Sequence, residues 1–450
     1  MADGGRVLVY GLGVSGAAVA AALGAEGVEV LAADDDTGPG PRRRAAELGI
    51  DLEAAPSARR LAALAGAVDE IVVSPGMAPR HRVFAAAGAV PVVGEVELAW
   101  RRARCPVVAV TGSNGKTTVT TLVRDMLGAS GRRAVAAGNI GAPLLEAVAG
   151  DAEVIVAEVS SFQLALTTTF RPAVAAWVNF SPDHLDWHAT VEGYRRAKAE
   201  VWARSGPGDV AVANAEDPVV LAEAAGPARR GATVVTFGLE TGDVRRRGTA
   251  LAGADGAAVV EVGDLPRAMP HDLVDALCAM ATAGAAGATP AGCRRALLEF
   301  AGLPHRVELV GEANGVRYYD DSKATTPGAV LAALAGVRSA VLIAGGRNKG
   351  LDLGVLAGAS DRVRAVVAIG EAADEVAAAF AGRVPVRPAA SMAEAVELAS
   401  ALAVSGDAVL LSPACASFDW YRSYGERGDD FARCVAALTG SAAPGPAVAP

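Results

Sequence analysis

Short apolar runs alternate with segments of helical periodicity along most of the chain, which is the pattern of an α/β protein. We predict buried strands at the apolar runs, which cover residues 6–10, 28–33, 71–73, 106–110, 154–158, 174–178, 318–319, 340–344 and 408–411. Apolar side chains at helical spacing cover residues 119–127, 194–203 and 271–286. Residues 209–265 have strand-type patterns and no recognisable chemistry. The repeated order of strand, turn and helix predicts parallel sheets.

The chain has 450 residues, which is too long for one hydrophobic core, so we expect several domains. The pattern predicts a Rossmann-like domain over residues 1–95 and a P-loop-type mononucleotide-binding domain over residues 96–302. A second Rossmann-like domain is expected over residues 303–440. Residues 441–450 are rich in Ala, Pro and Gly and are predicted to be a disordered tail.

A glycine-containing loop between a predicted strand and a predicted helix is the strongest chemical signal. It reads Thr111-Gly112-Ser113-Asn114-Gly115-Lys116-Thr117-Thr118. Such a loop binds phosphate, because its N–H groups and the helix N-terminus point at the anion. We expect Lys116 on the β- and γ-phosphates and Thr117 on Mg²⁺. The common pattern has a further glycine where this chain has Val110, and a plain glycine turn with a solvated lysine is the alternative.

The first strand is followed by a second glycine motif, Gly11-Leu12-Gly13-Val14-Ser15-Gly16. Acidic residues stand at the end of the next strand, at Asp34, Asp35 and Asp36. This arrangement is typical of a nucleotide-binding Rossmann-like opening, in which the acid contacts a ribose or a base. The motif by itself is weak, and the NAD site of a dehydrogenase is the alternative.

Polar residues also follow several other predicted strands, where the sites of α/β proteins form. Glu158 ends a buried strand and is the natural Mg²⁺ ligand, with a helix-capping acid as the alternative. His184 follows a strand and is flanked by acids, which favours a ligand or a substrate-facing role. Lys198 lies on a predicted helix and could be an ordinary solvated lysine.

Composition limits the classes of function. The chain is 52% hydrophobic, is 20% charged and has a net charge of −9, which argues against a nucleic-acid surface. We expect no signal peptide and no membrane span, and the five cysteines show no metal or disulfide spacing. The 41 basic residues include only four lysines, at positions 116, 198, 323 and 349. All four lie in site-like segments, which indicates roles that a guanidinium cannot fill.

Taken together, these motifs resemble those of the Mur ligases, and the resemblance spans nearly the whole chain. It is carried by the phosphate loop, by Gly138-Asn139-Ile140-Gly141, and by the segments 158–164, 179–186, 194–198, 303–306, 321–325 and 412–417. The resemblance implies an ATP-dependent, ADP-forming ligase that adds D-glutamate to UDP-N-acetylmuramoyl-L-alanine through an acyl phosphate. Such an enzyme serves peptidoglycan precursor synthesis in the cytoplasm, and thereby cell shape and division.

The resemblance also implies residue roles. Catalysis would fall to Lys116, Asn139, His184 and Lys198, and the metal ligands would be Thr117, Glu158, His184 and a carbamylated Lys198. ATP would be held by residues 112–118 together with Arg306, Asp321 and Lys323. The UDP-substrate would contact Ser15, Asp34, Asp35, Thr37, Ser74, Pro75, Gly76 and Asn139. D-Glutamate would contact His184, Thr325, Lys349, Ser417 and Tyr424.

The implied cofactors are ATP and two Mg²⁺ ions, and the implied state is a monomer that binds neither nucleic acid nor membrane. Two other classes of function are kept as alternatives. An NAD-dependent enzyme could use the first glycine motif, although the phosphate loop and the placement of the lysines count against it. A non-catalytic nucleotide switch would have no need of Glu158, His184 and Lys198 together.

Overall fold

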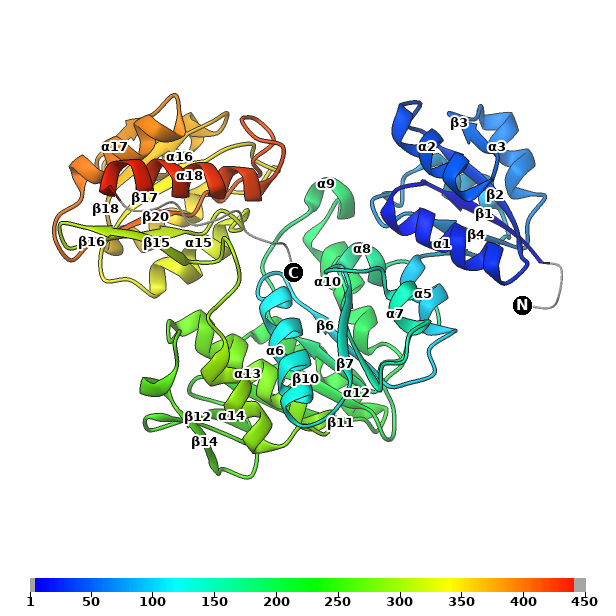
Figure 1. Ribbon diagram of the computed structural model, residues 1–450, viewed down its shortest axis with the longest axis horizontal. Coiled ribbons are helices and arrows are strands. Elements are labelled where there is room, and N and C mark those ends of the chain that lie inside the picture. Colours follow the sequence, from blue (N-terminus) through cyan, green and yellow to red (C-terminus); the bar gives the residue numbers. More distant parts are fainter. Residues whose placement is uncertain (1–4, 441–450) are drawn as a thin grey trace. The chain divides into compact units, whose positions relative to one another are not determined.

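The computed structural model describes residues 5–440 and contains three β-sheets covered by helices (Figure 1). The predicted tail at 441–450 lies outside the described residues. The chain divides into two compact units. The first unit contains residues 5–180, 187–261 and 276–297, and the second contains residues 181–186, 262–275 and 298–440. The α/β prediction is confirmed, whereas the predicted domain boundaries stay predictions.

The N-terminal sheet of the first unit is parallel and has the strand order β3-β2-β1-β4-β5. Its strands are β1 (Arg6–Tyr10), β2 (Glu29–Asp34), β3 (Leu52–Ala54), β4 (Glu70–Val73) and β5 (Val92–Val93). Its helices are α1 (Val14–Ala25), α2 (Pro39–Leu48), α3 (Ala58–Ala65), α4 (Arg82–Ala87) and α5 (Glu95–Trp100). Because β1, β2 and β4 are neighbours, the loops that follow them meet at one edge of the sheet.

The central sheet has nine strands in the order β14-β13-β12-β11-β10-β9-β6-β8-β7, parallel from β7 to β12 and antiparallel beyond. Its strands are β6 (Val107–Thr111), β7 (Ala134–Gly138), β8 (Val154–Glu158), β9 (Val174–Trp177), β10 (Val210–Asn214), β11 (Thr233–Gly238), β12 (Val244–Arg247), β13 (Ala250–Ala252) and β14 (Ala258–Glu261). Its helical segments are α6 (Lys116–Ala129), α7 (Leu144–Val148), α8 (Ser161–Leu164), α9 (Leu185–His188), α10 (Val191–Ala199), η1 (Glu200–Trp202), α11 (Pro218–Glu223), α12 (Ala225–Arg229), η2 (Val262–Asp264), α13 (Pro270–Ala285) and α14 (Pro290–Glu299).

The sheet of the second unit has the strand order β15-β16-β20-β17-β18-β19, in which only the edge strand β15 is antiparallel. Its strands are β15 (Glu308–Ala313), β16 (Val316–Asp320), β17 (Ala340–Gly345), β18 (Val363–Ile369), β19 (Val386–Pro388) and β20 (Ala408–Leu411). Its helical segments are α15 (Pro327–Ala335), η3 (Leu353–Arg362), α16 (Ala373–Phe380), α17 (Met392–Leu402) and α18 (Tyr424–Thr439).

The predicted strands and helices are present, with ends that shift by a few residues. Strands also form within residues 209–265 as expected, but the short helices α11 and α12 were not predicted there. Helix α11 begins after Asp217, whose carboxylate accepts hydrogen bonds from the backbone N–H groups of Val219 and Val220. Pro218 occupies the first helical position, where it costs no hydrogen bond. This Asp-Pro pair was the available signal for a helix start.

Helix α5 connects the N-terminal sheet with the central sheet through hydrogen bonds of two buried glutamates. The Glu97 carboxylate accepts from the backbone N–H groups of residues 168–170 and from the Thr169 hydroxyl. Arg101 pairs with Glu97 at 3.0 Å and with Glu70 of β4 at 2.7 Å. Glu95 accepts from the Leu145 N–H at the start of α7. These contacts hold the two sheets of the first unit together.

Among residues 5–440, no helix combines the length and the apolar character needed to cross a membrane.

Candidate functional site

The predicted phosphate loop has the expected geometry. Strand β6 ends at Thr111, Gly115 adopts a left-handed backbone with φ of 78°, and α6 begins at Lys116. The Lys116 ammonium donates hydrogen bonds to the carbonyls of Gly112 and Ser113, each at 3.0 Å. Thr117 and Thr118 lie in the first turn of α6 beside the loop. The N–H groups at this helix start are therefore placed to receive phosphate.

Glu158 and Asn139, both predicted site residues, meet beside this loop. Val110 of β6 lies in register with Glu158 of β8, so the carboxylate lies at the same edge of the sheet as the phosphate loop. The Asn139 side chain donates to Glu158 Oε1 at 2.8 Å. The other oxygen, Oε2, is buried and has no hydrogen-bond partner among the described residues. A buried carboxylate oxygen without a partner is expensive unless a cation binds it.

Lys198 is buried against the phosphate loop, which excludes the alternative of a solvated lysine. Its side chain is 1% exposed, and Nζ donates to the Gly112 carbonyl at 2.5 Å. Nζ also lies 4.7 Å from the centre of the Tyr194 ring on the same helix. Helix α10, capped by the Thr190 hydroxyl, thus presents an amine to the loop.

Two residues that position the phosphate loop were absent from the predicted site. The Asn179 side chain accepts from the Asn114 N–H at 2.9 Å and donates to the Asn114 carbonyl at 3.2 Å. The hydroxyl groups of Tyr194 and Ser113 are 3.1 Å apart. Asn179 directly follows the predicted strand at residues 174–178, and a polar residue at a strand end was the signal that could have found it.

The residues predicted to hold the UDP-substrate converge at one edge of the N-terminal sheet. The Ser74 hydroxyl donates to the Gly11 carbonyl at 2.8 Å, and Asp34 accepts from the Leu12 N–H at 2.6 Å. Gly16 is required here, because a Cβ on it would lie 1.9 Å from the Gly11 carbonyl oxygen. Ser15 is the second residue of α1, Thr37 lies in the loop after β2, and Pro75 and Gly76 follow Ser74.

Asp34 and Asp35 have different surroundings. Among residues 5–440, the hydrogen-bond donors to Asp34 are the backbone N–H groups of Leu12 and Asp36. Asp35 accepts from the Tyr10 hydroxyl at 2.8 Å, contacts His81 at 2.7 Å and pairs with Arg82. Burial by itself would raise the pKa of Asp35, but the hydrogen bonds from Arg82, Tyr10 and His81 outweigh burial and lower the pKa. The Asp35 carboxylate is therefore held as an anion near the glycine loop.

In the second unit, Asp183 joins two predicted residues. Its carboxylate accepts from the Lys349 ammonium at 2.8 Å and lies 3.1 Å from His184 Nε2. His184 has a left-handed backbone with φ of 55°. Asp183 was not predicted as a site residue, although it stands directly before His184. Because His184 belongs to the second unit and Lys198 to the first, their shared metal site stays a prediction.

The loop after β16 carries the predicted ATP residues Asp321 and Lys323. Asp321 is buried and accepts from the Ser412 hydroxyl at 2.7 Å and from the Val307 N–H at 3.3 Å. Burial raises its pKa to about 7. The Lys323 ammonium lies 3.7 Å from the centre of the Tyr424 ring, a cation–π distance. The structure thus brings a predicted ATP residue and a predicted D-glutamate residue together.

Three more predicted residues lie on neighbouring loops of this sheet. Thr325 follows the Lys323 loop, Ser417 is buried after β20, and Arg306 precedes β15. The backbone of Arg347, two residues before Lys349, bridges to Ala416, which precedes Ser417. The loops after β16, β17 and β20 therefore meet at the carboxyl ends of adjacent strands.

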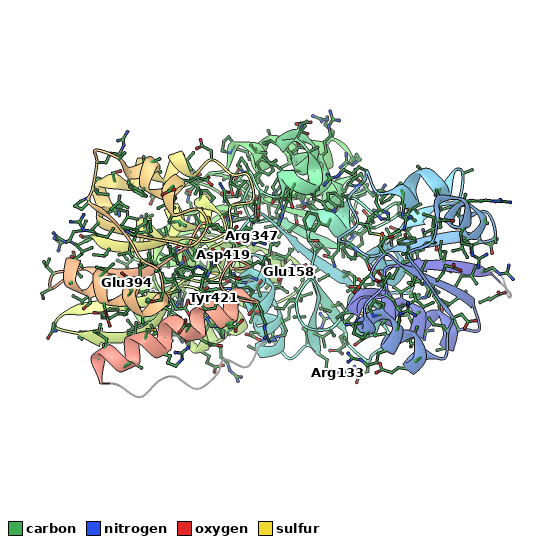
Figure 2. The ribbon with its side chains drawn as sticks, turned by 90° about the horizontal axis from the view of Figure 1, so that it is seen from above. Arg133, Glu158, Arg347, Glu394, Asp419 and Tyr421 are labelled. Carbon is green, nitrogen blue, oxygen red and sulfur yellow. The ribbon has the colours of Figure 1, made fainter. Side chains whose placement is uncertain are left out.

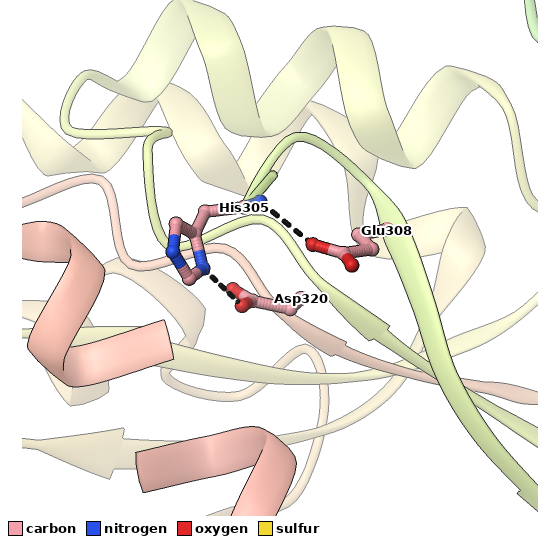
Figure 3. A group of neighbouring side chains, drawn as sticks. All are labelled: His305, Glu308 and Asp320. Atoms are coloured by element: carbon pink, nitrogen blue, oxygen red, sulfur yellow. Dashed lines mark hydrogen bonds and ion pairs between the residues drawn. The ribbon is translucent and has the colours of Figure 1, made fainter. Parts of the chain in front are cut away.

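His305 is a buried histidine that sequence reasoning did not place in the site. Its Nδ1 lies 2.7 Å from Asp320 Oδ2, and its backbone N–H donates to Glu308 at 2.9 Å (Figure 3). Burial alone would lower the pKa of His305, but the hydrogen bond and the charge of Asp320 outweigh it and raise the pKa. The His305 carbonyl accepts from the Lys323 N–H, so the pair supports the Lys323 loop.

Comparisons with known proteins show which family the chain resembles. A family model described as the Mur ligase middle domain matches residues 110–264, and one described as the Mur ligase, glutamate ligase domain matches residues 305–415. The UDP-N-acetylmuramoylalanine--D-glutamate ligase of Frankia casuarinae is 45% identical and covers 96% of this chain and 94% of the relative. The enzyme of the same name from Thermobifida fusca is 41% identical over 97% of this chain and 99% of the relative.

The chain belongs to the Mur ligase family.

Solved Mur ligases share the fold at low sequence identity. MurF from Acinetobacter baumannii has a TM-score of 0.61 at 18% identity, with 95% of this chain and 93% of that chain covered. UDP-N-acetylmuramate-alanine ligase MurC from Thermotoga maritima has a TM-score of 0.59 at 19% identity, with 96% of this chain and 100% of that chain covered. These likenesses concern the fold alone.

Mur ligases use ATP and Mg²⁺, and the residues of this chain fit both. The strand, loop and helix around Lys116 fit a triphosphate. The buried, unpartnered Oε2 of Glu158 fits a hard cation held beside that triphosphate. The Thr117 hydroxyl stands at the position of the helix start that reaches such a cation in phosphate loops.

Proposed function

We propose that this Mur ligase joins D-glutamate to UDP-N-acetylmuramoyl-L-alanine, with ATP cleaved to ADP and phosphate. The observation that carries the assignment of the amino acid is the 45% identity, over 96% of the chain, to a relative named as the D-glutamate ligase. Further relatives with the same name are 38–44% identical over similar lengths. The product is a cytoplasmic precursor of peptidoglycan.

The reaction has two steps. A carboxylate oxygen of the L-alanine residue takes the γ-phosphoryl group of ATP, which breaks the bond to the bridging oxygen and releases ADP. The amine of D-glutamate then attacks the acyl carbon, loses a proton, and expels inorganic phosphate with the former carboxylate oxygen. Donor and acceptor are both anionic, so the site must supply positive charge between them. Lys116 and the start of α6 supply part of that charge.

The N-terminal sheet binds the UDP end of the substrate in this proposal. Ser15, Asp34, Asp35, Thr37 and the Ser74-Pro75-Gly76 turn form the contact surface, and Asn139 reaches the reacting end. Support comes from the convergence of the Gly11 loop, Asp34 and Ser74 at one edge of the sheet. Hydrogen bonds from Arg82, Tyr10 and His81 lower the pKa of Asp35 and keep it ionised, which suits an acceptor for a uracil N–H.

Two Mg²⁺ ions, when bound, would supply positive charge beside the phosphates. Thr117 and Glu158 would hold the first ion. His184 and a carbamylated Lys198 would hold the second, since a carbamate turns an amine into an anionic oxygen ligand. Burial of the Lys198 amine against the Gly112 carbonyl supports this assignment, because it places the amine directly beside the phosphate loop.

The second unit binds the remaining groups. Arg306, Asp321 and Lys323 contact ATP, while His184, Thr325, Lys349, Ser417 and Tyr424 hold the two carboxylates of D-glutamate. The meeting of the loops after β16, β17 and β20 supports this assignment. We further propose three domains, over 1–95, 96–302 and 303–440, in a monomeric enzyme.

Release of ADP from ATP, measured with UDP-N-acetylmuramoyl-L-alanine and a panel of amino acids, tests the proposal. We expect ADP release to require D-glutamate and to be lost with L-glutamate, L-lysine or diaminopimelate. Equal turnover with one of those three would refute the assignment of the amino acid. Hydride transfer to or from NAD would instead support the alternative of a dehydrogenase.

A further inference from the structure

Arg427 of helix α18 is a buried cation whose partners are all neutral. Its residue is 1% exposed. Nε donates to the Ser322 hydroxyl at 2.9 Å, and Nη2 donates to the carbonyls of Ser322 at 2.9 Å and Cys415 at 3.2 Å. Nη1 is buried without a hydrogen-bond partner among the described residues. No carboxylate of residues 5–440 lies within ion-pairing distance of this guanidinium.

The guanidinium touches the three loops that carry the proposed substrate residues. Ser322 precedes Lys323 after β16, and Cys415 precedes Ser417 after β20. Nη1 faces the turn after β17, because a Cβ on Gly346 would lie 3.1 Å from it. That turn leads to Lys349. One side chain therefore contacts the loops of three adjacent strands at their carboxyl ends.

Two other cations on these loops, Lys349 and Arg347, are paired with carboxylates, which makes Arg427 different from them. Lys349 pairs with Asp183 at 2.8 Å, and Arg347 pairs with Glu371 at 2.8 Å. Asp419 lies in the same region as Arg347 (Figure 2), but its carboxylate accepts from the Glu371 N–H. Asp320 is engaged with His305. The positive charge of Arg427 thus stays uncompensated by a direct ion pair in the chain.

Burying such a charge is costly, and a purely structural bridge between carbonyl groups has no need of it. Neutral donors such as Asn or Gln bridge backbone carbonyls at a smaller desolvation cost. Burial lowers the pKa of Arg427 to about 10, so the guanidinium is still protonated at neutral pH. A charge kept in a site of low dielectric acts strongly on any anion that enters it.

We propose that Arg427 is a positioning residue for the amino-acid substrate: it aligns the loops after β16, β17 and β20 and supplies the positive charge that favours a dianionic amino acid between them. This inference rests on the proposed function, because it takes the amino acid to be D-glutamate. Arg427 itself does not touch the substrate, since the residue is 1% exposed and its Nη1 is buried.

Kinetics of Arg427→Met and Arg427→Lys test the inference. Methionine removes both the charge and the hydrogen bonds, whereas lysine keeps the charge and loses the fixed arrangement of N–H donors of the guanidinium. We expect Arg427→Met to raise KM for D-glutamate roughly tenfold to a hundredfold while KM for UDP-N-acetylmuramoyl-L-alanine stays unchanged. Arg427→Lys should recover most of that loss. Arg433→Met is the control, because Arg433 is an exposed residue of the same helix that pairs with Asp430.

A second readout separates charge from shape. D-Glutamine has one carboxylate fewer than D-glutamate, so the preference of the enzyme for D-glutamate should fall in Arg427→Met and persist in Arg427→Lys. Equal damage in both variants, spread over the KM values of all three substrates, would overturn the inference. Loss of folding in both variants would overturn it as well, because the residue would then serve the fold alone. Failure of the wild-type enzyme to use D-glutamate would instead refute the proposed function.

Discussion

Glu158 is the residue whose substitution tests the proposed metal binding. Its Oε1 accepts from Asn139, and its buried Oε2 has no partner among the described residues. Glu158→Gln keeps the shape and removes the charge. We expect an equal or higher Tm without Mg²⁺, and a fall in kcat of roughly 10²–10³-fold. Thermal unfolding and ADP release over a range of Mg²⁺ concentrations measure both effects.

The exposed Glu146 provides a matched control for this variant. Glu146→Gln should leave both quantities unchanged. If Glu158→Gln kept the wild-type kcat and the wild-type dependence on Mg²⁺, the carboxylate would have no role in binding the ion.

Lys198 carries the proposed carbamate and makes a different prediction. Arginine cannot be carbamylated at working pH, because its guanidinium stays protonated. Lys198→Arg should lose roughly two to four orders of magnitude in kcat. In buffer depleted of CO₂, added bicarbonate should stimulate the wild type and leave the variant unaffected. Arg196→Lys, on the exposed face of the same helix, is the control. A wild-type rate that does not change with added bicarbonate would contradict carbamylation.

At the scale of elements, helix α18 approaches the His305–Asp320 pair through a glycine. A Cβ on Gly428 would lie 2.2 Å from His305 Nδ1 and 2.4 Å from Asp320 Oδ2. We expect Gly428→Ala to destabilise the second unit by about 1–3 kcal/mol, because the added methyl group has no room. Gly425→Ala, whose nearest contacts would be 3.6 Å and 3.7 Å away, should stabilise it by up to about 1 kcal/mol.

Urea unfolding of the two glycine variants measures this difference. Alanine is the better helix former at both positions, so propensity alone predicts two stabilised proteins. Equal stabilisation would show that α18 does not pack closely on the histidine pair.

Helix α5 should make the stability of the first unit depend on pH. Burial would raise the pKa of Glu97, but the hydrogen bonds from Thr169 and Thr168 outweigh it and lower the pKa from 4.5 to about 2. Because the pKa of Glu97 is lowered on folding, the carboxylate stabilises the folded protein at pH values above 4.5, which is its pKa in the unfolded chain. This stabilisation is lost as the pH falls towards 2. We expect Glu97→Gln to cost about 3 kcal/mol at pH 7, from the size of that shift.

Urea unfolding at pH 7 and pH 3 tests the α5 prediction. The difference between the wild type and Glu97→Gln should shrink at the lower pH, while the exposed Glu47→Gln should behave as wild type at both. A difference that is constant with pH would place the effect in packing and not in the carboxylate.

Local patterns explain why the phosphate loop could be predicted and α5 could not. Strand β6, the loop and helix α6 are consecutive, so their spacing alone determines the site. The contacts of Glu97 join residues 71–73 positions apart, and nothing near Glu97 in the sequence signals them. The same holds for Arg427, whose partner Ser322 lies 105 positions away.

At the scale of the whole molecule, the sequence predicted the α/β class and the strand-end loops that carry the proposed site. The pairing of Asn139 with Glu158 and the burial of Lys198 could not be predicted, because both depend on the strand order of the central sheet. In that sheet, β8 and β7 lie on one side of β6, and β9 lies on the other. Periodicity cannot give such an order, because parallel neighbours are joined through helices of variable length. Motif resemblance supplied roles that the residues by themselves left open.

Transfer of ¹⁸O from substrate to phosphate tests the central claim most directly. UDP-N-acetylmuramoyl-L-alanine labelled with ¹⁸O in its carboxylate is incubated with ATP, Mg²⁺ and D-glutamate, and both products are analysed by mass spectrometry. The account predicts one ¹⁸O atom in each inorganic phosphate and a nucleotide product heavier by one D-glutamate residue. Phosphate free of ¹⁸O, or ATP cleavage without that nucleotide product, would contradict ligation through an acyl phosphate.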